Sequence, residues 1–252
     1  MNAPAKTDPW IRCPKPNPAA RLRLFCLPYA GGGASIFKHW GHALPDSIEV
    51  CAIQLPGREE RIAETPFRRV EQLLPVLLDR LRPYLDRQIA FFGHSMGAFL
   101  SYELARALTE ENRAPAHLIV SGQRAPHLPL SRPESYHLSD TDFCERLRSL
   151  NGTPASVLAE PELLAMILPL LRSDFEMSET YQRVPKTRLD CPIQVFGGDR
   201  DEEVDHAGLE AWQETTSASV QIEILPGDHF FLQSQTDALL ETVERTLRPH
   251  RH

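Results

Sequence analysis

The sequence has few basic residues for its acidic content and lacks long apolar runs. Its 27 Lys and Arg are outnumbered by 34 Asp and Glu, which leaves a net charge of −7. This balance argues against a general nucleic-acid binder, because binding to phosphate backbones depends on clustered Lys and Arg. No uninterrupted apolar run is long enough to span a membrane. We therefore expect neither a nucleic acid nor a membrane as a partner.

The cysteines do not form a disulfide or metal-binding pattern. There are five of them, an odd number, and no two stand in a C-x-x-C pair. Cys26 and Cys51 lie in apolar, strand-like runs, where a free thiol behaves as a small hydrophobe. The first residues, MNAPAKTDPW, lack the basic-then-apolar pattern of a signal peptide. We expect no bound metal and a reducing, cytoplasmic compartment.

The chain of 252 residues is long enough to bury a core without disulfides, as one large α/β domain or two small ones. Residues 1–20 contain five prolines, which exclude a regular helix or a central strand. We predict an extended lead-in over residues 1–20, attached to the body by Trp10 and Ile11. We also predict a single domain over residues 21–252.

After the lead-in, short apolar runs alternate with stretches of helical periodicity. The apolar runs predict strands at residues 22–27, 48–53, 88–93, 117–122, 192–198 and 220–225. Several are apolar on both faces, as buried parallel strands are. Helical periodicity predicts helices at residues 70–85, 96–108 and 236–247, the last with Thr236 as its N-cap. This alternation is typical of a doubly wound α/β sheet.

Residues 124–185 interrupt the alternation, because they contain no good strand and several short helical patterns. One helix is expected from a cap at Ser139 or Asp140 through Leu147, before Asn151-Gly152, and another from Pro161 through Leu171. The segment is interpreted either as plain structural helices or as a lid. Insertions at the C-terminal edge of a parallel sheet overhang the place where such sheets bind ligands.

The strongest local motif is FFGHSMG, in which Gly93, Ser95 and Gly97 form G-x-S-x-G between an apolar strand and a helix. This is the context of a nucleophile elbow, a sharp turn that presents a reactive serine. The serine would lie at a helix N-terminus, where free N–H groups favour developing negative charge. The competing interpretation is a tight structural turn that happens to contain a serine.

A nucleophilic serine needs a base, and His229 is the one histidine of ten that directly follows the last predicted strand. This placement fits the order nucleophile, acid, histidine of the α/β-hydrolase fold. His39 and His42 could share a helix face, but no third metal ligand stands near them.

The acid is expected after the strand at residues 192–198, where Asp199 and Asp201 both stand. We favour Asp201, because residues 198–204 fit the turn pattern G-x-x-D-x-x-V, with Val204 packed on the core. Asp199 is expected to accept backbone N–H bonds within the turn instead.

The oxyanion hole is expected to use two backbone N–H groups. One belongs to Met96, directly after the serine, and we assign the other to Ala30 in the loop PYAGGG. The glycines of this loop let the backbone approach a substrate closely. A phosphate-binding interpretation is weak, because neither GK[ST] nor G-x-G-x-x-G follows.

Together these motifs resemble those of the type II thioesterases that accompany polyketide and non-ribosomal peptide synthases. The resemblance covers nearly the whole chain after residue 20. It rests on LPYAGGGAS at 27–35, LPGREER at 55–61, GHSMGA at 93–98, LPLLRSDFEMSETY at 168–181, and FGGDRDEEV with PGDHFFL at 196–204 and 226–232. The resemblance implies an α/β-hydrolase fold with a helical lid. It also implies hydrolysis of stalled or wrong acyl groups from the phosphopantetheine arm of acyl or peptidyl carrier proteins.

On this hypothesis Ser95 attacks the thioester, His229 transfers the proton and water cleaves the acyl-enzyme, with no metal or organic cofactor. We expect a monomer that meets its carrier protein transiently. Two alternatives stay open. The same residues would serve an esterase or lipase of free small esters or of acyl-CoA, and the fold could also carry a non-catalytic binding protein.

Two further sets of residues are given roles. The apolar side chains of the insertion exceed what its own packing needs, and we expect them to line an acyl chamber: Phe143, Leu147, Leu164, Ile167, Leu168, Leu171, Phe175 and Met177. Arginines at or after the LPGREER motif are candidates for docking an acidic carrier protein: Arg58, Arg61, Arg68 and Arg69. The alternative interpretation is that these arginines are ordinary solvated surface charges, because Glu59, Glu60 and Glu64 lower the net positive charge of the cluster.

Overall fold

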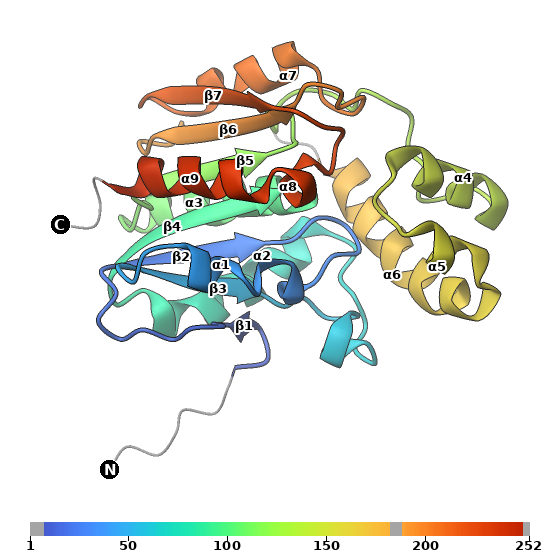
Figure 1. Ribbon diagram of the computed structural model, residues 1–252, viewed down its shortest axis with the longest axis horizontal. Helices are drawn as coiled ribbons and strands as arrows, with labels where there is room; N and C mark the ends of the chain where they lie inside the picture. The colour runs from blue at the N-terminus through green and yellow to red at the C-terminus, as the bar shows by residue number, and fades with distance from the viewer. Residues whose placement is uncertain (1–7, 182–187, 249–252) are drawn as a thin grey trace.

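The computed structural model describes residues 8–181 and 188–248. Its sheet has seven strands in the order β1-β3-β2-β4-β5-β6-β7, and only the β1–β3 pair is antiparallel (Figure 1). The strands are β1 (Ile11–Arg12), β2 (Leu22–Leu27), β3 (Ile48–Ile53), β4 (Gln88–His94), β5 (His117–Ser121), β6 (Ile193–Gly198) and β7 (Val220–Leu225). The six strands expected from the sequence are confirmed, each with its ends within one residue.

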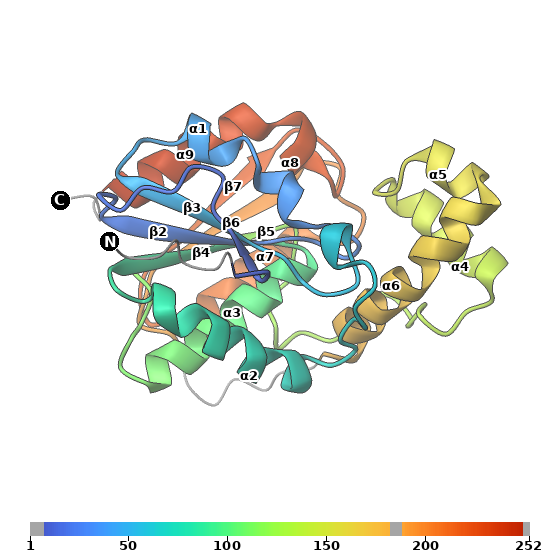
Figure 2. The same cartoon turned by 90° about the horizontal axis from the view of Figure 1, so that it is seen from below.

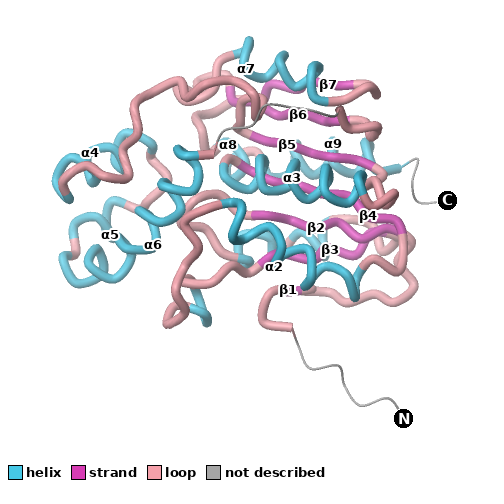
Figure 3. Tube along the Cα trace, turned by 180° about the vertical axis from the view of Figure 1, so that it is seen from behind, coloured by secondary structure: helices cyan, strands magenta, loops and turns pink. Residues whose placement is uncertain are grey.

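Helices cover both faces of the sheet, which explains why every residue of β2 and β3 is buried. One face is covered by the 3₁₀ helix η1 (Ala34–Phe37), α1 (Trp40–Ala43), α8 (Phe231–Ser234) and α9 (Thr236–Leu247) (Figure 1). Across the other face lie α2 (Val70–Leu81), α3 (Met96–Glu110), α7 (His206–Glu210) and η4 (Ala211–Thr215) (Figure 3). None of the helices in the described ranges is long and apolar enough to cross a lipid bilayer.

The lead-in attaches to the body as expected, since Trp10 and Ile11 are 6% and 5% exposed. It also forms the short edge strand β1, which the sequence did not predict. The Gln54 N–H donates to the Trp10 carbonyl at 2.8 Å, beside this pairing with β3. Residues 1–7 of the expected lead-in lie outside the described residues.

Several helix ends differ from the expected ones. α2 ends at Leu81, where the 3₁₀ helix η3 (Arg82–Tyr84) begins with Pro83 as its second residue, whereas α3 continues to Glu110. Thr236 begins α9 but is not its N-cap, a position that Gln235 occupies. The Thr236 hydroxyl donates instead to the carbonyl of Leu232 in the preceding helix, α8, at 2.8 Å.

Three helices project from the end of the sheet at which the parallel strands terminate: α4 (Asp140–Leu150), α5 (Ala155–Ala159) and α6 (Pro161–Thr180) (Figures 1 and 2). We call them the lid segment. Ser139 caps α4 by accepting the Asp142 N–H, and Asn151 ends it in the left-handed conformation. α6 runs nine residues past the expected end at Leu171, and α5 was not expected. Residues 182–185 of the expected insertion lie outside the described residues.

Candidate active site

Ser95 occupies a strained turn between β4 and α3. Its φ of 53° and ψ of −116° are rarely adopted by a residue with a side chain. The Ser95 N–H donates to the Ser121 carbonyl of β5 at 2.8 Å, which ties the turn to the sheet. A Cβ at Gly93 would lie 2.0 Å from the Gly97 carbonyl oxygen, and one at Gly97 would lie 2.2 Å from that of Leu27. Only glycine therefore fits on either side of the serine.

Ser95, His229 and Asp201 form one hydrogen-bonded chain. His229 Nε2 lies 3.0 Å from Ser95 Oγ, and His229 Nδ1 lies 2.9 Å from Asp201 Oδ2. The three residues follow β4, β7 and β6, whose parallel ends bring them to one edge of the sheet. With its proton on Nδ1, the imidazole donates to Asp201 and leaves Nε2 free to accept the serine proton.

The loops that carry the acid and the histidine are joined to each other. Asp199 Oδ1 accepts the Gly227 N–H at 2.7 Å, and the Arg200 N–H donates to the Gly227 carbonyl at 2.9 Å. Asp199 was expected to bond within its own turn, but it holds the neighbouring histidine loop instead. Asp201 uses its second oxygen, Oδ1, to accept the Glu203 N–H at 2.8 Å. Val204 is buried as expected, at 7% exposed.

A second histidine, His94, packs beside His229. His94, the last residue of β4, is fully buried, and its Nδ1 lies 2.9 Å from Ser121 Oγ. Its ring centroid is 5.3 Å from that of His229. Burial, followed by the charge of His229, holds the pKa of His94 well below its usual value, so this ring is neutral. Sequence reasoning gave His94 no role, although its position directly before Ser95 was a usable signal.

The two residues expected to supply the oxyanion hole are Met96, directly after the serine, and Ala30, in the loop after β2. Met96 is the first residue of α3, so its N–H has no partner within the helix. Ala30 lines the same cavity as Ser95 and His229. Two bonds order the loop around Ala30: the Gly32 N–H donates to the Tyr29 carbonyl at 2.9 Å, and the Gly31 N–H donates to Asp174 Oδ2 at 2.7 Å.

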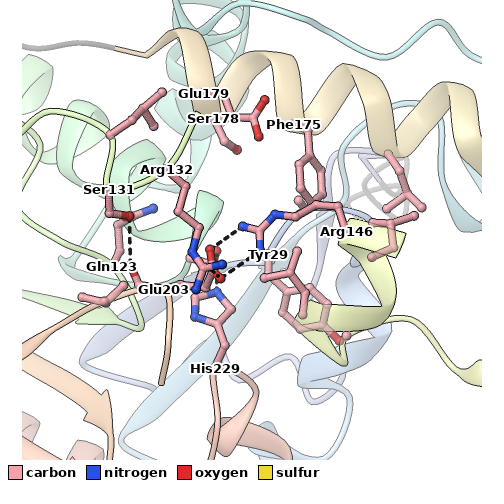
Figure 4. Close-up of a pocket in the computed structure, with 18 of the residues that line it drawn as sticks. Tyr29, Gln123, Ser131, Arg132, Arg146, Phe175, Ser178, Glu179, Glu203 and His229 are labelled. Atoms are coloured by element: carbon pink, nitrogen blue, oxygen red, sulfur yellow. Dashed lines mark hydrogen bonds and ion pairs between the residues drawn. The ribbon is translucent and has the colours of Figure 1, made fainter. Parts of the chain in front are cut away.

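A cavity of about 130 Å³ lies between these residues and the lid segment (Figure 4). Its apolar wall comes from Leu130, Leu147, Leu150, Leu171 and Phe175. Its polar wall is formed by Gln123, Arg124, Arg132, Arg146, Glu179 and Glu203. Arg146 of α4 bonds Glu203 at 2.9 Å near His229, so part of the wall is a charged pair (Figure 4).

The chamber expected from the sequence is only partly correct. Leu147, Leu171 and Phe175 line the cavity, but Phe143, Leu164, Ile167 and Leu168 do not. Those four pack within the lid segment, because its three helices need a small apolar core of their own. Met177 packs into the main core instead. Several lining residues that sequence reasoning missed lie in the loop after β5, at residues 123–133.

The arginine prediction is wrong for two of the four residues. Arg58 is 3% exposed and makes a bidentate pair with Asp174. Arg61 is 5% exposed and lies 4.0 Å above the ring of Trp10. Neither reaches a docking surface. The side chains of Arg68 and Arg69 are 61% and 40% exposed, and both pair with Glu176 of α6. For them, docking stays a prediction.

A serine, histidine and aspartate hydrogen-bonded at the C-terminal edge of a parallel sheet, beneath inserted helices, define an α/β hydrolase. Within this class, residues 22–247 match the thioesterase domain family. The chain is 43% identical over 245 residues to the gramicidin S biosynthesis protein GrsT of Aneurinibacillus migulanus, covering 97% of this chain and 96% of GrsT. It is 39% identical over 228 residues to the thioesterase PikA5 of Streptomyces venezuelae, covering 90% of this chain and 81% of PikA5. The chain belongs to the thioesterase domain family.

A solved structure gives the same result for the fold. The chain is similar to the type II thioesterase BorB from the borrelidin biosynthetic cluster, with a TM-score of 0.88 and 36% identity. The match covers 97% of this chain and 100% of BorB. The expected α/β-hydrolase fold is therefore confirmed, as is the resemblance to type II thioesterases, and the protein is an enzyme of the thioesterase class.

Proposed function

We propose that this protein is a stand-alone editing thioesterase. It removes aberrant or stalled acyl groups from the phosphopantetheine arm of acyl or peptidyl carrier proteins. The observation that carries the proposal is the hydrogen-bonded chain of Ser95, His229 and Asp201, which opens into a cavity beneath the lid segment. Relatives named for antibiotic biosynthesis, such as GrsT, support the carrier-bound substrate.

The mechanism follows from the positions of the three side chains. Ser95 Oγ attacks the thioester carbonyl while His229 Nε2, 3.0 Å away, takes its proton. The N–H groups of Met96 and Ala30 stabilise the negative oxygen of the tetrahedral intermediate. His229 then gives the proton to the leaving thiol. In the second half, water attacks the acyl carbonyl carbon while His229 Nε2 takes one of its protons. The bond from this carbon to Ser95 Oγ then breaks, His229 returns the proton to Oγ, and the carboxylic acid leaves. No step needs a metal or an organic cofactor.

The cavity limits which acyl groups enter without movement of the lid segment. At about 130 Å³ it is well below the roughly 300–1,000 Å³ of common ligand pockets. Its wall includes Arg124, Arg146 and Glu203 beside the apolar side chains. The chamber therefore offers both apolar and charged contacts to an acyl group. The carrier protein is proposed to bind transiently to a monomer, outside the cavity.

The test compares one acyl group presented in three ways: on a phosphopantetheinylated carrier protein, as a free pantetheine thioester, and as a small oxygen ester. The proposal expects the highest kcat/KM for the carrier-bound form. Ser95→Ala should lose on the order of a million-fold in turnover while its melting temperature is kept. Ser149→Ala, on the exposed face of α4, is the matched control and should behave as wild type.

Three results would overturn the proposal. A folded Ser95→Ala protein with near-normal turnover would contradict the serine mechanism. Failure of a serine-reactive phosphonate to label the wild type would contradict it too. Equal kcat/KM for the oxygen ester and the carrier-bound thioester would instead favour a general esterase.

A further inference from the structure

A buried carboxylate of the lid segment reaches into the oxyanion loop. Asp174, in the second half of α6, is 0% exposed. Its Oδ1 and Oδ2 each accept a bond from the Arg58 guanidinium at 2.9 Å. Oδ2 also accepts the Gly31 N–H at 2.7 Å. One side chain therefore joins α6, the LPGREER motif and the loop of Ala30.

Arg58 completes the connection from the other side. Its Nη1 donates to the Gly32 carbonyl at 3.0 Å, so the ion pair binds two peptides of the loop, Ala30–Gly31 and Gly32–Gly33. An ion pair removed from water gains little net stability, because desolvation of both charges offsets their attraction. An apolar pair of similar volume would hold α6 to the body at least as well. The charges are therefore better explained by the two peptide groups that they orient.

These bonds determine where the Ala30 N–H points. In a trans peptide the C=O and the N–H point in opposite directions. The Tyr29 carbonyl accepts the Gly32 N–H at 2.9 Å, so the Ala30 N–H of the same peptide points away from this turn. Gly31 and Gly32 form this turn, and Asp174 binds the first while Arg58 binds the second.

α6 also contacts this loop directly. A Cβ added at Gly31 would lie 2.5 Å from Leu171 Cδ2, and Gly31 has a φ of +78°. Leu171 and Asp174 are three residues apart and therefore lie on one face of α6. The helix thus contacts Gly31 through both the Leu171 side chain and the Asp174 carboxylate.

We propose that Asp174 and Arg58 are positioning residues for the oxyanion hole, and that docking of α6 by this pair aims the Ala30 N–H at the developing oxyanion. The inference rests on the proposed function, in which Ala30 is one of the two donors. It makes the oxyanion hole dependent on the lid segment: when α6 leaves the loop, Gly31 loses its acceptor and Arg58 loses its counter-charge.

The test measures transition-state stabilisation separately from substrate binding. Asp174→Asn removes the charge and the bidentate geometry at nearly constant volume. We expect kcat for a small pantetheine thioester to fall about 10²- to 10³-fold, as after the loss of one oxyanion-hole donor, with KM changed little. Affinity for an acyl trifluoromethyl ketone, which forms a tetrahedral oxyanion on Ser95, should fall by a similar factor.

A double variant separates positioning from folding. Asp174→Leu with Arg58→Met replaces the ion pair by apolar side chains, an exchange that often leaves stability unchanged or higher. We expect its melting temperature to stay near that of the wild type while kcat and ketone affinity stay low. If this variant does not fold, Asp174→Asn alone decides the question.

Glu176→Gln is the matched control. Glu176 lies two residues further along α6 and also joins the lid segment to the body, through Arg68 and Arg69, but it does not touch the oxyanion loop. With the small thioester it should keep wild-type kcat and ketone affinity. An equal loss in Glu176→Gln and Asp174→Asn would show that both residues merely fasten the lid segment, and the inference would be wrong.

Failure of this inference is distinct from failure of the proposed function. Wild-type kcat and ketone affinity in Asp174→Asn, together with an inactive Ser95→Ala, would remove the positioning role and leave the serine mechanism intact. An active Ser95→Ala would remove both.

Discussion

Asp201 Oδ2 lies 2.9 Å from His229 Nδ1, and the Asp201 side chain is 1% exposed. Asp199, two residues earlier in the same loop, has a side chain that is 45% exposed and accepts the Gly227 N–H. The two carboxylates therefore have different roles. Asp201 orients the imidazole, whereas Asp199 connects the acid loop to the histidine loop.

This division predicts opposite results for two matched substitutions. Asp201→Asn should lower kcat by about 10⁴-fold in a folded protein, because the imidazole loses its correct tautomer. Asp199→Asn keeps an oxygen that can accept the Gly227 N–H, so most of the turnover should remain. Thioester hydrolysis and thermal melting of both variants provide the measurement. The assignment of the acid would have to be reversed if Asp199→Asn silenced a still-folded enzyme.

Burial of His94 predicts a pH-dependent stability. The pKa of this histidine lies well below the value of 6.5 that it has when exposed, mainly because of burial. Above pH 6.5 both the folded and the unfolded chain hold it neutral. Below that pH the unfolded chain takes up a proton that the folded protein does not. His94 therefore lowers the free energy of unfolding by up to about 1.4 kcal/mol for each pH unit below 6.5.

Denaturant unfolding between pH 8 and pH 5 measures this contribution. The wild type should lose more stability on acidification than His94→Asn, whose side chain does not titrate. His39→Asn, the same substitution at an exposed histidine, is the control. Parallel curves for the wild type and His94→Asn would contradict the prediction.

The sheet and the proposed catalytic chain could be predicted because their signals are local. Strands β2 to β7 are each recognisable as a mainly apolar run, and Ser95, Asp201 and His229 each stand within four residues of the end of one of them. Parallel topology then brings strand ends together without further information. The strained turn at Ser95 was predictable for the same reason, since its glycines stand two residues away on either side.

The environment of the arginines could not be predicted in this way. Arg58 pairs with Asp174, which is 116 residues away, and nothing near either residue in the sequence indicates the pairing. Similarly, an apolar residue of the lid segment is equally suited to the cavity or to the small core of α4–α6. Phe143 and Phe175 illustrate this: their rings pack together, yet only Phe175 lines the cavity.

The outer part of the lid segment, residues 140–168, is predicted to open more readily than the end of α6 that packs on the body. α4, α5 and the first half of α6 pack mainly on one another. The second half of α6 is held to the body by Asp174, Met177 and Glu176. Lids are formed by weakly held elements, so amide hydrogen exchange should be faster in residues 140–168 than in β2 or β4. Residues 174–180 should exchange nearly as slowly as the body. Protection throughout 140–180 equal to that of the core strands would exclude a lid.

The exposed pair Arg68 and Arg69 is predicted to attract an acidic carrier protein. Within residues 8–181 and 188–248, both guanidiniums share one carboxylate, that of Glu176, so two positive charges beside α6 face a single negative one. Reversal of both charges to Glu should lower kcat/KM for a carrier-bound substrate by about tenfold and weaken its salt dependence, because steering by charge is screened by ions. The free pantetheine thioester should react as before. Arg80→Glu, at the far end of α2 from Arg69, is the matched control. If kcat/KM for the carrier-bound substrate and its salt dependence are the same in the double variant as in Arg80→Glu, these arginines are ordinary solvated charges and the carrier protein docks elsewhere.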